Sequence, residues 1–457
     1  MARIFWFRRD LRLQDNVALN ASIAGAKADG DSLVYPFYLL DSTAFEALEG
    51  IRQHSLVESL RSLQQSLDGS LSISSASGRD SLAQQFAAQA AAAGVKTVHA
   101  TRAFDPDGVA EQNAVGLALK QLGVFLALDD SYYAVRPGTV AKDDGSPYRV
   151  YTPFFKNWAE LASDRPVALE PGAKFETLGA SNLPQPTKAS PIKVIAGEAF
   201  ALRTFERFKK RALEEYDEQR NRADISGTSH LSHALAHGEI HPRTLLVQLG
   251  DSAAHTVFRK EIAWREFYAD VLWHNPHSLT EYYDPKFAKM RYDSGDLAAA
   301  RLEAWQQGKT GYPMVDAGMR QLLQTGWMHN RVRMIVASFL VKDLHLEWQQ
   351  GAEWFERHLS DFDPASNTHG WQWTAGCGTD ASPYFRIFNP ISQGLKFDPN
   401  GDYVRRFVPE LAHIQGAAVH EPWLLIDGLA KGYPAPIVDH SVEREESLAR
   451  LAELKTL

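Results

Sequence analysis

The sequence predicts an α/β N-terminal region with a parallel, Rossmann-like sheet, followed by an all-α C-terminal region. Its 457 residues exceed one ordinary domain and suit two or three. Apolar runs of strand length alternate with helical patterns up to about residue 130. Beyond residue 200 the patterns are helical only, and nine of the eleven tryptophans lie there.

The first region alternates strand and helix signals. Helices are expected over 82–93, over 109–122 and along the stripe Leu56, Leu60, Leu63 and Leu67. Strands are expected at 4–7, 33–40, 71–74, 95–98 and 124–128. This alternation implies a parallel sheet covered on both faces. No G-x-G-x-x-G follows a strand, so the sheet is either a scaffold or holds a ligand at a switch point of its strand order.

The chain is expected to divide at 1–130, at a connector over 131–200, and at a helical region over 201–457. Five prolines between residues 160 and 200 break any long element there. Further along, helices are expected at 204–222, 255–273, 297–308, 314–324, 330–344, 352–359 and 441–457.

Composition narrows the class of protein. The single cysteine, Cys377, excludes an internal disulfide and fits a reducing cytoplasm. The N-terminus lacks the features of a signal peptide, and no apolar stretch has the length of a membrane helix, so we expect a cytoplasmic protein without a membrane partner. No Cys or His spacing indicates a metal site. The net charge of −8 taken alone argues against nucleic acid, but phosphate contacts require only a local basic surface.

Two segments carry polar groups suited to ligand binding. The run from Gly227 to Ser232 offers hydroxyls and backbone amides beside a helix start, which suits either an anion such as a pyrophosphate or a plain N-cap. Glu261, Trp264 and Arg265 share one helical face by their spacing. They could hydrogen-bond and stack on a base, or form the exposed edge of an amphipathic helix.

Three later segments add further candidates. Asn330 and Met334 share a helical face with Arg333 beside them, and Arg331 can bind phosphate. Asp361, Asp363 and Asn367 precede Trp371 and Trp373, which suit a core, an interface or an electron path. The last set is either a local positive surface or a solvated face, and it comprises Tyr384, Arg386, Lys396, Arg405 and Arg406.

Taken in order, several motifs resemble the photolyase/cryptochrome family over nearly the whole chain, closest to its class I cyclobutane pyrimidine dimer photolyases. They are FWFRRDLR at 5–12, SPYRVYTPF at 146–154, GKTGYP at 308–313 and NTHGWQWTAGCGTDASPYFRIFNP at 367–390. The resemblance implies an N-terminal antenna-binding domain and a C-terminal helical domain that binds FAD and DNA. It also implies a monomer that acts on damaged DNA.

The resemblance assigns a set of flavin-binding positions. Arg333 and Asp343 match an ion pair beside the isoalloxazine ring, and Asn367 faces flavin N5, where an amide suits the fully reduced flavin that repair needs. His230 replaces a common arginine of the phosphate loop. The full set is Tyr216, Thr228, Ser229, His230, Leu231, Ser232, Arg265, Arg333, Asp343, Asp361, Asp363 and Asn367.

The resemblance also implies a thymine-dimer pocket made of Glu261, Trp264, Asn330, Met334 and Trp373. The resemblance implies catalytic roles for Glu261 and Asn330. The dimer would be flipped out of the duplex, and an electron from photoexcited reduced FAD would split it and then return. Phosphates around the lesion would contact Arg220, Arg331, Arg386 and Lys396.

Trp371 and Trp348 match the proximal and middle members of the family's electron-transfer chain. The resemblance therefore implies a catalytic role for both tryptophans. Gly295 stands at the distal position, so Tyr292, Trp305 or Trp354 is the expected exit. For the antenna, a deazaflavin is slightly favoured over methenyltetrahydrofolate. The alternative functions are a cryptochrome-type photoreceptor, which Asn367 and the short C-terminus disfavour, and a flavoprotein that binds DNA without repair.

Overall fold

The computed structural model describes residues 1–380 and 386–456. The chain forms two compact units. Unit 1 contains Met1–Arg211 and Ser229–Pro276, and unit 2 contains Ala212–Thr228 and His277–Leu457.

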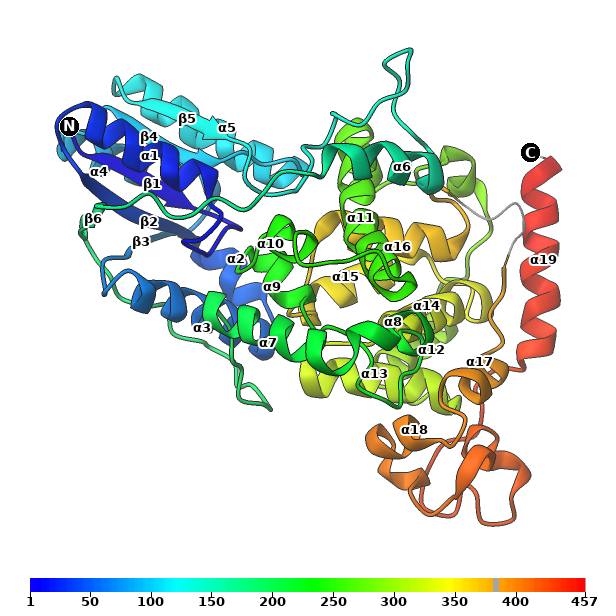
Figure 1. The fold of residues 1–457 in the computed structure, drawn as a ribbon. Helices are drawn as coiled ribbons and strands as arrows, with labels where there is room; N and C mark the ends of the chain where they lie inside the picture. The colour runs from blue at the N-terminus through cyan, green and yellow to red at the C-terminus, as the bar shows by residue number, and fades with distance from the viewer. Residues whose placement is uncertain (381–385, 457) are drawn as a thin grey trace. The chain divides into compact units, whose positions relative to one another are not determined.

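Unit 1 contains a parallel sheet whose strands lie in the order β3-β2-β1-β4-β5 (Figure 1). The order reverses between β1 and β4, because the chain builds the sheet outward from β1 first to one side and then to the other. The strands are β1 (Arg3–Phe7), β2 (Leu33–Asp41), β3 (Ser72–Ala76), β4 (Thr97–Thr101) and β5 (Phe125–Asp129). The predicted parallel α/β architecture is confirmed.

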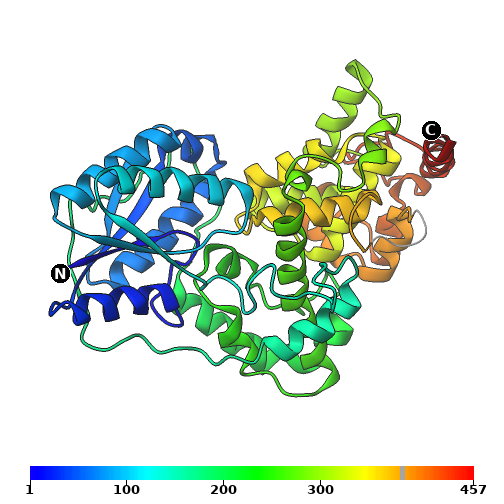
Figure 2. The ribbon, with the colours of Figure 1, turned by 90° about the horizontal axis from the view of Figure 1, so that it is seen from above.

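Helices cover both faces of this sheet (Figure 2). On one face α1 (Val17–Ala28) and α3 (Gly50–Ser66) bury Leu19, Ile23 and Leu60 against the strands. On the other face α4 (Arg79–Ala92) and α5 (Pro106–Gln121) bury Phe86 and Leu119. The short α2 (Ser42–Ala47) follows β2 directly.

The proline-rich stretch predicted as a connector contains two regular elements. Helix α6 (Tyr151–Leu161) buries Phe154 and Trp158, and β6 (Lys174–Phe175) pairs parallel with β2 at the sheet edge. Polar contacts fix the rest of the stretch to the sheet region, including the ion pair of Lys27 with Glu170 at 2.7 Å. The stretch is therefore part of the packed body of unit 1.

The remaining helices of unit 1 are α7 (Glu198–Arg211), α9 (Ser232–His237), α10 (Pro242–Leu246) and α11 (Ala253–His274). The longest, α11, carries the fully buried Glu266. Its carboxylate accepts hydrogen bonds from the Trp158 indole and from the backbone amides of Ala134 and Val135. These bonds fix α11 to α6 and to the chain that follows β5.

Unit 2 is helical throughout its described residues. Its α-helices are α8 (Tyr216–Gln219), α12 (Asp296–Gln306), α13 (Pro313–Thr325), α14 (Asn330–Ser338), α15 (Trp348–His358), α16 (Pro364–Ala375), α17 (Pro390–Phe397), α18 (Asp402–Phe407) and α19 (His440–Thr456). Short 3-10 turns are η1 (Leu213–Glu215), η3 (Pro285–Lys289), η5 (Pro409–Leu411), η6 (Gly416–His420) and η7 (Pro422–Leu424), and η2 (Pro276–Leu279) joins the units in sequence.

Two predicted helices are interrupted. The helix expected over 330–344 ends as α14 at Ser338 and continues as the π-helix η4 (Phe339–Asp343), which shifts the register of the side chains that follow. The helix expected over 204–222 divides into α7, η1 and α8 because Ala212 leaves helical geometry, with φ −140° and ψ −13°. The other predicted helices of this region are confirmed within a few residues.

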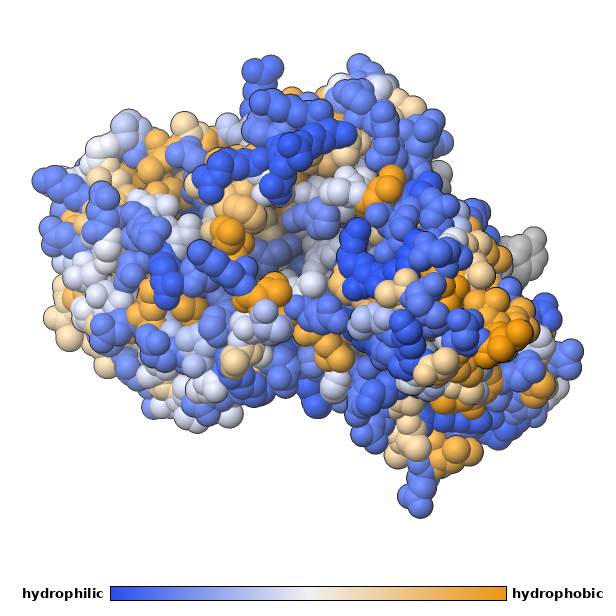
Figure 3. All heavy atoms as spheres, turned by 90° about the horizontal axis from the view of Figure 1, so that it is seen from below, coloured by the Kyte–Doolittle hydropathy of each residue, from blue (hydrophilic) through white to orange (hydrophobic). Residues whose placement is uncertain are grey.

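No described helix is long and apolar enough to cross a membrane. The face drawn in Figure 3 is mostly hydrophilic, with separate apolar areas between the polar side chains.

Candidate functional site

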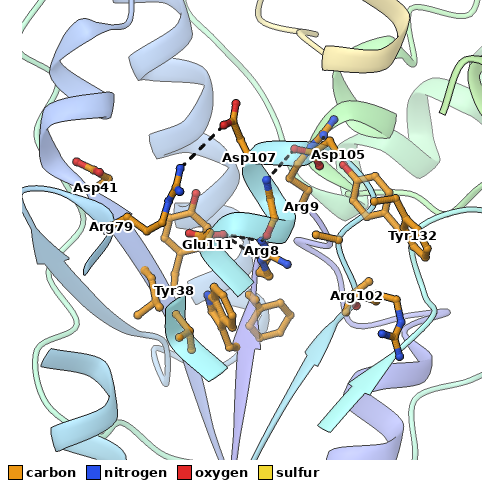
Figure 4. A pocket seen from close by; sticks show the side chains of 18 of the residues that line it. Arg8, Arg9, Tyr38, Asp41, Arg79, Arg102, Asp105, Asp107, Glu111 and Tyr132 are labelled. Carbon is orange, nitrogen blue, oxygen red and sulfur yellow. Dashed lines mark hydrogen bonds and ion pairs between the residues drawn. The ribbon is translucent and has the colours of Figure 1, made fainter. Parts of the chain in front are cut away.

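Unit 1 has a cavity of about 340 Å³ at the carboxyl ends of its strands, at the reversal of strand order between β1 and β4 (Figure 4). Ligands of open α/β sheets bind at such a switch point. Aromatic rings and aliphatic side chains form much of the lining, including Trp6, Tyr38, Phe104, Tyr132 and Tyr133. The shape and lining suit a flat aromatic ligand.

The arginines that line this cavity are paired within the protein. Arg8 lies 2.6 Å from Glu111 and its guanidinium covers the Trp6 ring at 4.6 Å. Arg9 and Arg79 lie 3.9 Å from Asp105 and Asp107, respectively, as the dashed lines in Figure 4 mark. The pocket therefore carries little unsatisfied charge for a ligand to neutralise.

The predicted phosphate loop lies at the change from unit 2 to unit 1. Thr228 ends the first segment of unit 2, and Ser229, His230, Leu231 and Ser232 begin the second segment of unit 1. His230 has φ 54°, a left-handed conformation that a non-glycine residue seldom adopts. The Ser229 hydroxyl accepts from the Leu231 amide at 3.4 Å, which closes the turn ahead of α9.

The predicted helical face of Glu261, Trp264 and Arg265 is present on α11. The Trp264 ring stacks on the Tyr151 ring of α6, with centroids 3.7 Å apart and planes 9° from parallel. Arg265 covers the rings of Tyr132 and Tyr133 at 5.4 and 4.7 Å. Sequence reasoning missed these three tyrosines, although Tyr151 stands within the conspicuous SPYRVYTPF run.

The predicted pairing of Arg333 with Asp343 is wrong. Arg333 Nη2 lies 2.7 Å from Asp361 Oδ2 on the segment before α16, whereas Asp343 Oδ1 lies 2.5 Å from Nδ1 of His440 at the start of α19. The π-helix η4 separates Asp343 from the helical register of Arg333, so spacing along one helix could not identify the true partners.

Burial dominates the ionisation of the η4 residues. Asp343 is fully buried, and desolvation raises its pKa to about 6 against the opposing hydrogen bond from His440. Desolvation likewise lowers the pKa of the adjacent Lys342 to about 7. Its ammonium donates to the backbone carbonyl of Arg386.

Part of unit 2 has the features of a ligand cradle. Asp361 Oδ1 and Asp343 Oδ2 are buried and have no hydrogen-bond partner within residues 1–380 and 386–456. On α16, Asp363 caps the helix through the Ser366 amide, and Asn367 donates to the Ala352 carbonyl at 3.1 Å. A Cβ placed on Gly370, which follows Asn367 by one turn, would meet no atom within 4 Å. The buried acceptor on Asp361, which precedes Asp363 and Asn367 in the chain, fits a flavin that brings hydroxyl and N–H donors.

Several predicted tryptophans are buried in unit 2. Trp348 is the first residue of α15 and Trp371 lies on α16; both are under 4% exposed, and neither indole nitrogen has a partner in the described chain. A Cβ on Gly351 of α15 would come within 2.1 Å of the Trp371 ring, so this indole packs directly on the α15 backbone. Trp305 contacts Trp371 with centroids 6.0 Å apart. Trp373, also on α16, is half-buried.

Predicted phosphate-binding residues gather on unit 2. The Arg331 guanidinium donates to Asn221 Oδ1 at 2.7 and 3.2 Å and covers the Phe397 ring at 4.7 Å. Lys396 lies over the same ring at 5.4 Å. The Met334 sulfur, one turn after Asn330 on α14, lies 3.6 Å from Arg331 Nη1.

The remaining predicted cations differ in their surroundings. Arg220 covers the ring of the buried Tyr216 at 5.8 Å, and Arg386 is exposed. Arg405 is held by Asp402 at 2.6 Å, and Arg406 is exposed. Tyr384 lies outside the described residues.

Within residues 1–380 and 386–456, no three His, Cys, Asp or Glu side chains are placed to hold a metal ion.

Comparison with known families gives two matches along the chain. Residues 3–177 match the family described as DNA photolyase, and residues 258–453 match the FAD binding domain of DNA photolyase. Curated relatives cover almost the full length. The deoxyribodipyrimidine photo-lyase of Agrobacterium fabrum is 39% identical over 99% of this chain and 98% of its own. That of Escherichia coli is 36% identical over 98% and 97%.

Solved structures agree with these relatives. A bacterial class III photolyase from Agrobacterium tumefaciens has a TM-score of 0.86 and 37% identity over 100% of this chain and 98% of its own. A Synechocystis cryptochrome has a TM-score of 0.85 and 27% identity over 98% of both chains. An archaeal photolyase from Sulfolobus tokodaii that holds two FAD molecules shares the fold, with a TM-score of 0.84 at 24% identity over 99% of this chain and 100% of its own. The chain therefore belongs to the photolyase/cryptochrome family, as a photolyase enzyme that combines a DNA-photolyase domain with the FAD-binding domain of DNA photolyases.

Proposed function

We propose that this enzyme repairs cyclobutane pyrimidine dimers in DNA by light-driven electron transfer from reduced FAD. The observation that carries the proposal is the arrangement of two residues on α11. Glu261 lies one turn before Trp264, and the Trp264 indole stacks face to face on the Tyr151 ring. An immobilised indole offers a stacking surface for an extruded base, and a nearby carboxylate offers a hydrogen bond to it. The lesion is proposed independently of the class of photolyase, because a class III photolyase is among the similar structures.

The flavin is proposed to contact unit 2 at Asp361, Asp363 and Asn367, together with the loop 228–232. When bound and reduced, FAD supplies on illumination the electron that splits the dimer. Arg333 holds Asp361 in place through its 2.7 Å ion pair, and the Asn367 amide, fixed by its bond to Ala352, brings no acidic proton to the ring. Glu261 would hydrogen-bond a pyrimidine carbonyl, while Asn330 and Met334 would contact the base edges and rings.

DNA binding is proposed at the cluster of Arg331 and Lys396 on Phe397, with Arg220 and Arg386 as further phosphate contacts. The support is geometric, since Asn221 and Phe397 hold the Arg331 guanidinium in place next to Lys396, and a guanidinium is a favoured phosphate ligand. A local basic cluster is compatible with a net charge of −8, because phosphate contacts act at short range. We further propose that the enzyme acts as a cytoplasmic monomer.

The unit 1 cavity is proposed to hold a second, light-harvesting chromophore. Its aromatic lining and internally paired arginines suit a flat chromophore without a strong charge, which favours a deazaflavin over a folate with its acidic tail.

Trp371 and Trp348 are proposed to relay electrons to the flavin when it is bound in an oxidised form.

The experiment compares two lesions. The chemically reduced protein is illuminated with DNA that carries cyclobutane dimers and, separately, with DNA that carries (6-4) photoproducts. The proposal expects dimer loss only. Loss of (6-4) photoproducts with intact dimers would contradict the proposed specificity while leaving the photolyase assignment in place.

A further inference from the structure

Tyr282 occupies an unusual position beside α15 in unit 2. Its ring meets the Trp348 ring edge-on, with centroids 6.2 Å apart and planes at 85°. Its hydroxyl donates to Glu347 Oε1 at 3.2 Å. Glu347 is the N-cap of α15 and Trp348 is the first residue of that helix. One phenol therefore contacts an oxidisable indole and a carboxylate that are consecutive in the chain.

The surroundings keep Tyr282 in place and protonated. The phenol is 6% exposed, and burial, followed by the neighbouring Tyr292 and Glu347, raises its pKa well above that of a free tyrosine. The following residue is fixed by the hydrogen bond from the Tyr283 amide to Gln372 at 2.7 Å. A buried, protonated phenol can lose an electron readily only if its proton has an acceptor within hydrogen-bond distance.

Glu347 meets this requirement because it accepts the Tyr282 hydrogen bond and is itself half-buried, so that a proton received there can pass on to water. Trp348, in contrast, is 1% exposed and its indole nitrogen has no partner among the described residues. An indole without a proton acceptor that loses an electron remains a cation radical in an apolar setting, which favours its reduction by the adjacent tyrosine.

We propose that Tyr282 is a redox-active tyrosine that reduces oxidised Trp348 and transfers its phenolic proton to Glu347. The inference rests on the proposed relay through Trp371 and Trp348. The Tyr282 O–H bond breaks, its electron fills the hole on Trp348, and its proton binds the Glu347 carboxylate. The products are a neutral tyrosyl radical, a neutral indole and a carboxylic acid. A soluble thiol then returns one electron and one proton to Tyr282.

The other expected exits lack this combination of groups. Trp305 is fully buried and donates its indole N–H to the Val336 carbonyl at 3.0 Å, which is not a base. Trp354 packs on His358 with centroids 4.1 Å apart. Tyr292 stacks on Tyr282 at 6.4 Å and is half-buried, so it lies one step beyond Tyr282.

The test uses the full-length protein loaded with oxidised FAD and excited by a light flash. Radicals are identified by transient absorption and by electron paramagnetic resonance with ring-deuterated tyrosine. The parent protein should show an indole radical that gives way to a tyrosyl radical, more slowly in D2O than in H2O. Tyr282→Phe should lose the tyrosyl signal and prolong the indole radical, and Glu347→Gln should lower the tyrosyl yield about tenfold.

Tyr433→Phe is the matched control, because Tyr433 is also a buried phenol that donates to a carboxylate, Asp316 at 2.6 Å, but forms no ring pair with an indole among the described residues. It should leave both radicals unchanged. An unchanged tyrosyl signal in Tyr282→Phe, or its loss only in Tyr292→Phe, would overturn the inference. An indole radical that never yields tyrosyl would overturn it and leave the relay intact. Absence of any indole radical would overturn both, while the repair assay on chemically reduced parent protein reports separately on the proposed repair function.

Discussion

The unit 1 cavity and the acidic cradle of unit 2 satisfy their charges in different ways. At the edge of the cavity, Arg8, Arg9 and Arg79 each face an acidic side chain of the same unit. In unit 2, Asp343 and Asp361 each have one partner and keep a second buried carboxylate oxygen without one in the described chain. The arginines of the first site are paired within the protein, whereas in the second the Asp361 oxygen is left as an acceptor for a ligand.

This difference indicates how strongly each site should depend on its ligand. A buried polar atom without a partner costs about 1–3 kcal/mol. A ligand with hydrogen-bond donors should therefore stabilise the cradle of unit 2, while a chromophore in unit 1 should change stability less.

Arg333→Ala should be the most damaging of these changes. It leaves the buried Asp361 carboxylate without its cation, at a cost of about 3–4 kcal/mol. Chemical unfolding should show this loss, and purified protein should retain little FAD. Arg8→Ala is the counterpart in unit 1 and should cost about 1 kcal/mol, because its partner Glu111 reaches solvent. Equal costs for the two variants would contradict the contrast.

Asp343 should make the stability of unit 2 depend on pH. Its pKa is about 6 in the folded protein and near 4 when unfolded, so the folded state binds the extra proton between these values. The free energy of unfolding should therefore fall, from this group alone, by about 2–3 kcal/mol as pH rises from 4 to 6, and then stay level. Asp343→Asn should lack this slope, so the unfolding free energy of the parent minus that of the variant should itself fall between pH 4 and 6. A difference curve that rises or stays flat over this range would refute the assignment.

Much of the fold and part of the candidate site could be predicted from the sequence, whereas the contrast between the two sites could not. Alternating apolar runs predicted the sheet of unit 1, because each strand and helix carries its own period. The α11 face followed from spacing alone. The partners of Arg333 and Asp343 did not, because the π-helix at 339–343 changes the register and His440 comes from a helix 97 positions later in the chain. The cavity, the Tyr151 stack and the Tyr282 contacts depend on packing between distant segments, which no local pattern encodes.

Glu261→Ala should separate flavin binding from repair. FAD should remain bound, because the cradle of unit 2 is untouched, while repair per absorbed photon should fall about tenfold through the lost charged hydrogen bond. Asp251→Ala, an exposed acid just before the same helix, serves as the control and should repair normally. Repair by Glu261→Ala equal to that of the parent would remove Glu261 from the mechanism.

Ala103→Phe should test the unit 1 cavity by filling it. Ala103 lines the cavity, so the larger ring should exclude the second chromophore and leave FAD in place. The absorbance of the purified protein should lose the antenna component only. Retention of a second chromophore in this variant would show that it binds elsewhere.

Lys396→Ala should give the smallest effect. Loss of one phosphate contact should weaken DNA binding modestly and reduce the slope of affinity against salt by about one. Lys431→Ala, which removes an exposed lysine outside the cluster on Phe397, should leave the slope unchanged. If both variants share the parent slope, Lys396 lies away from the DNA.

The most direct measurement of the central claim is dimer loss in light and in darkness. The purified protein, with its FAD chemically reduced, is mixed with DNA containing thymine dimers and divided between illuminated and dark samples. The account predicts dimer loss only under illumination, in proportion to absorbed light. Equal dimer content in both samples, with flavin reduced and DNA bound, would contradict the claim that this photolyase repairs pyrimidine dimers.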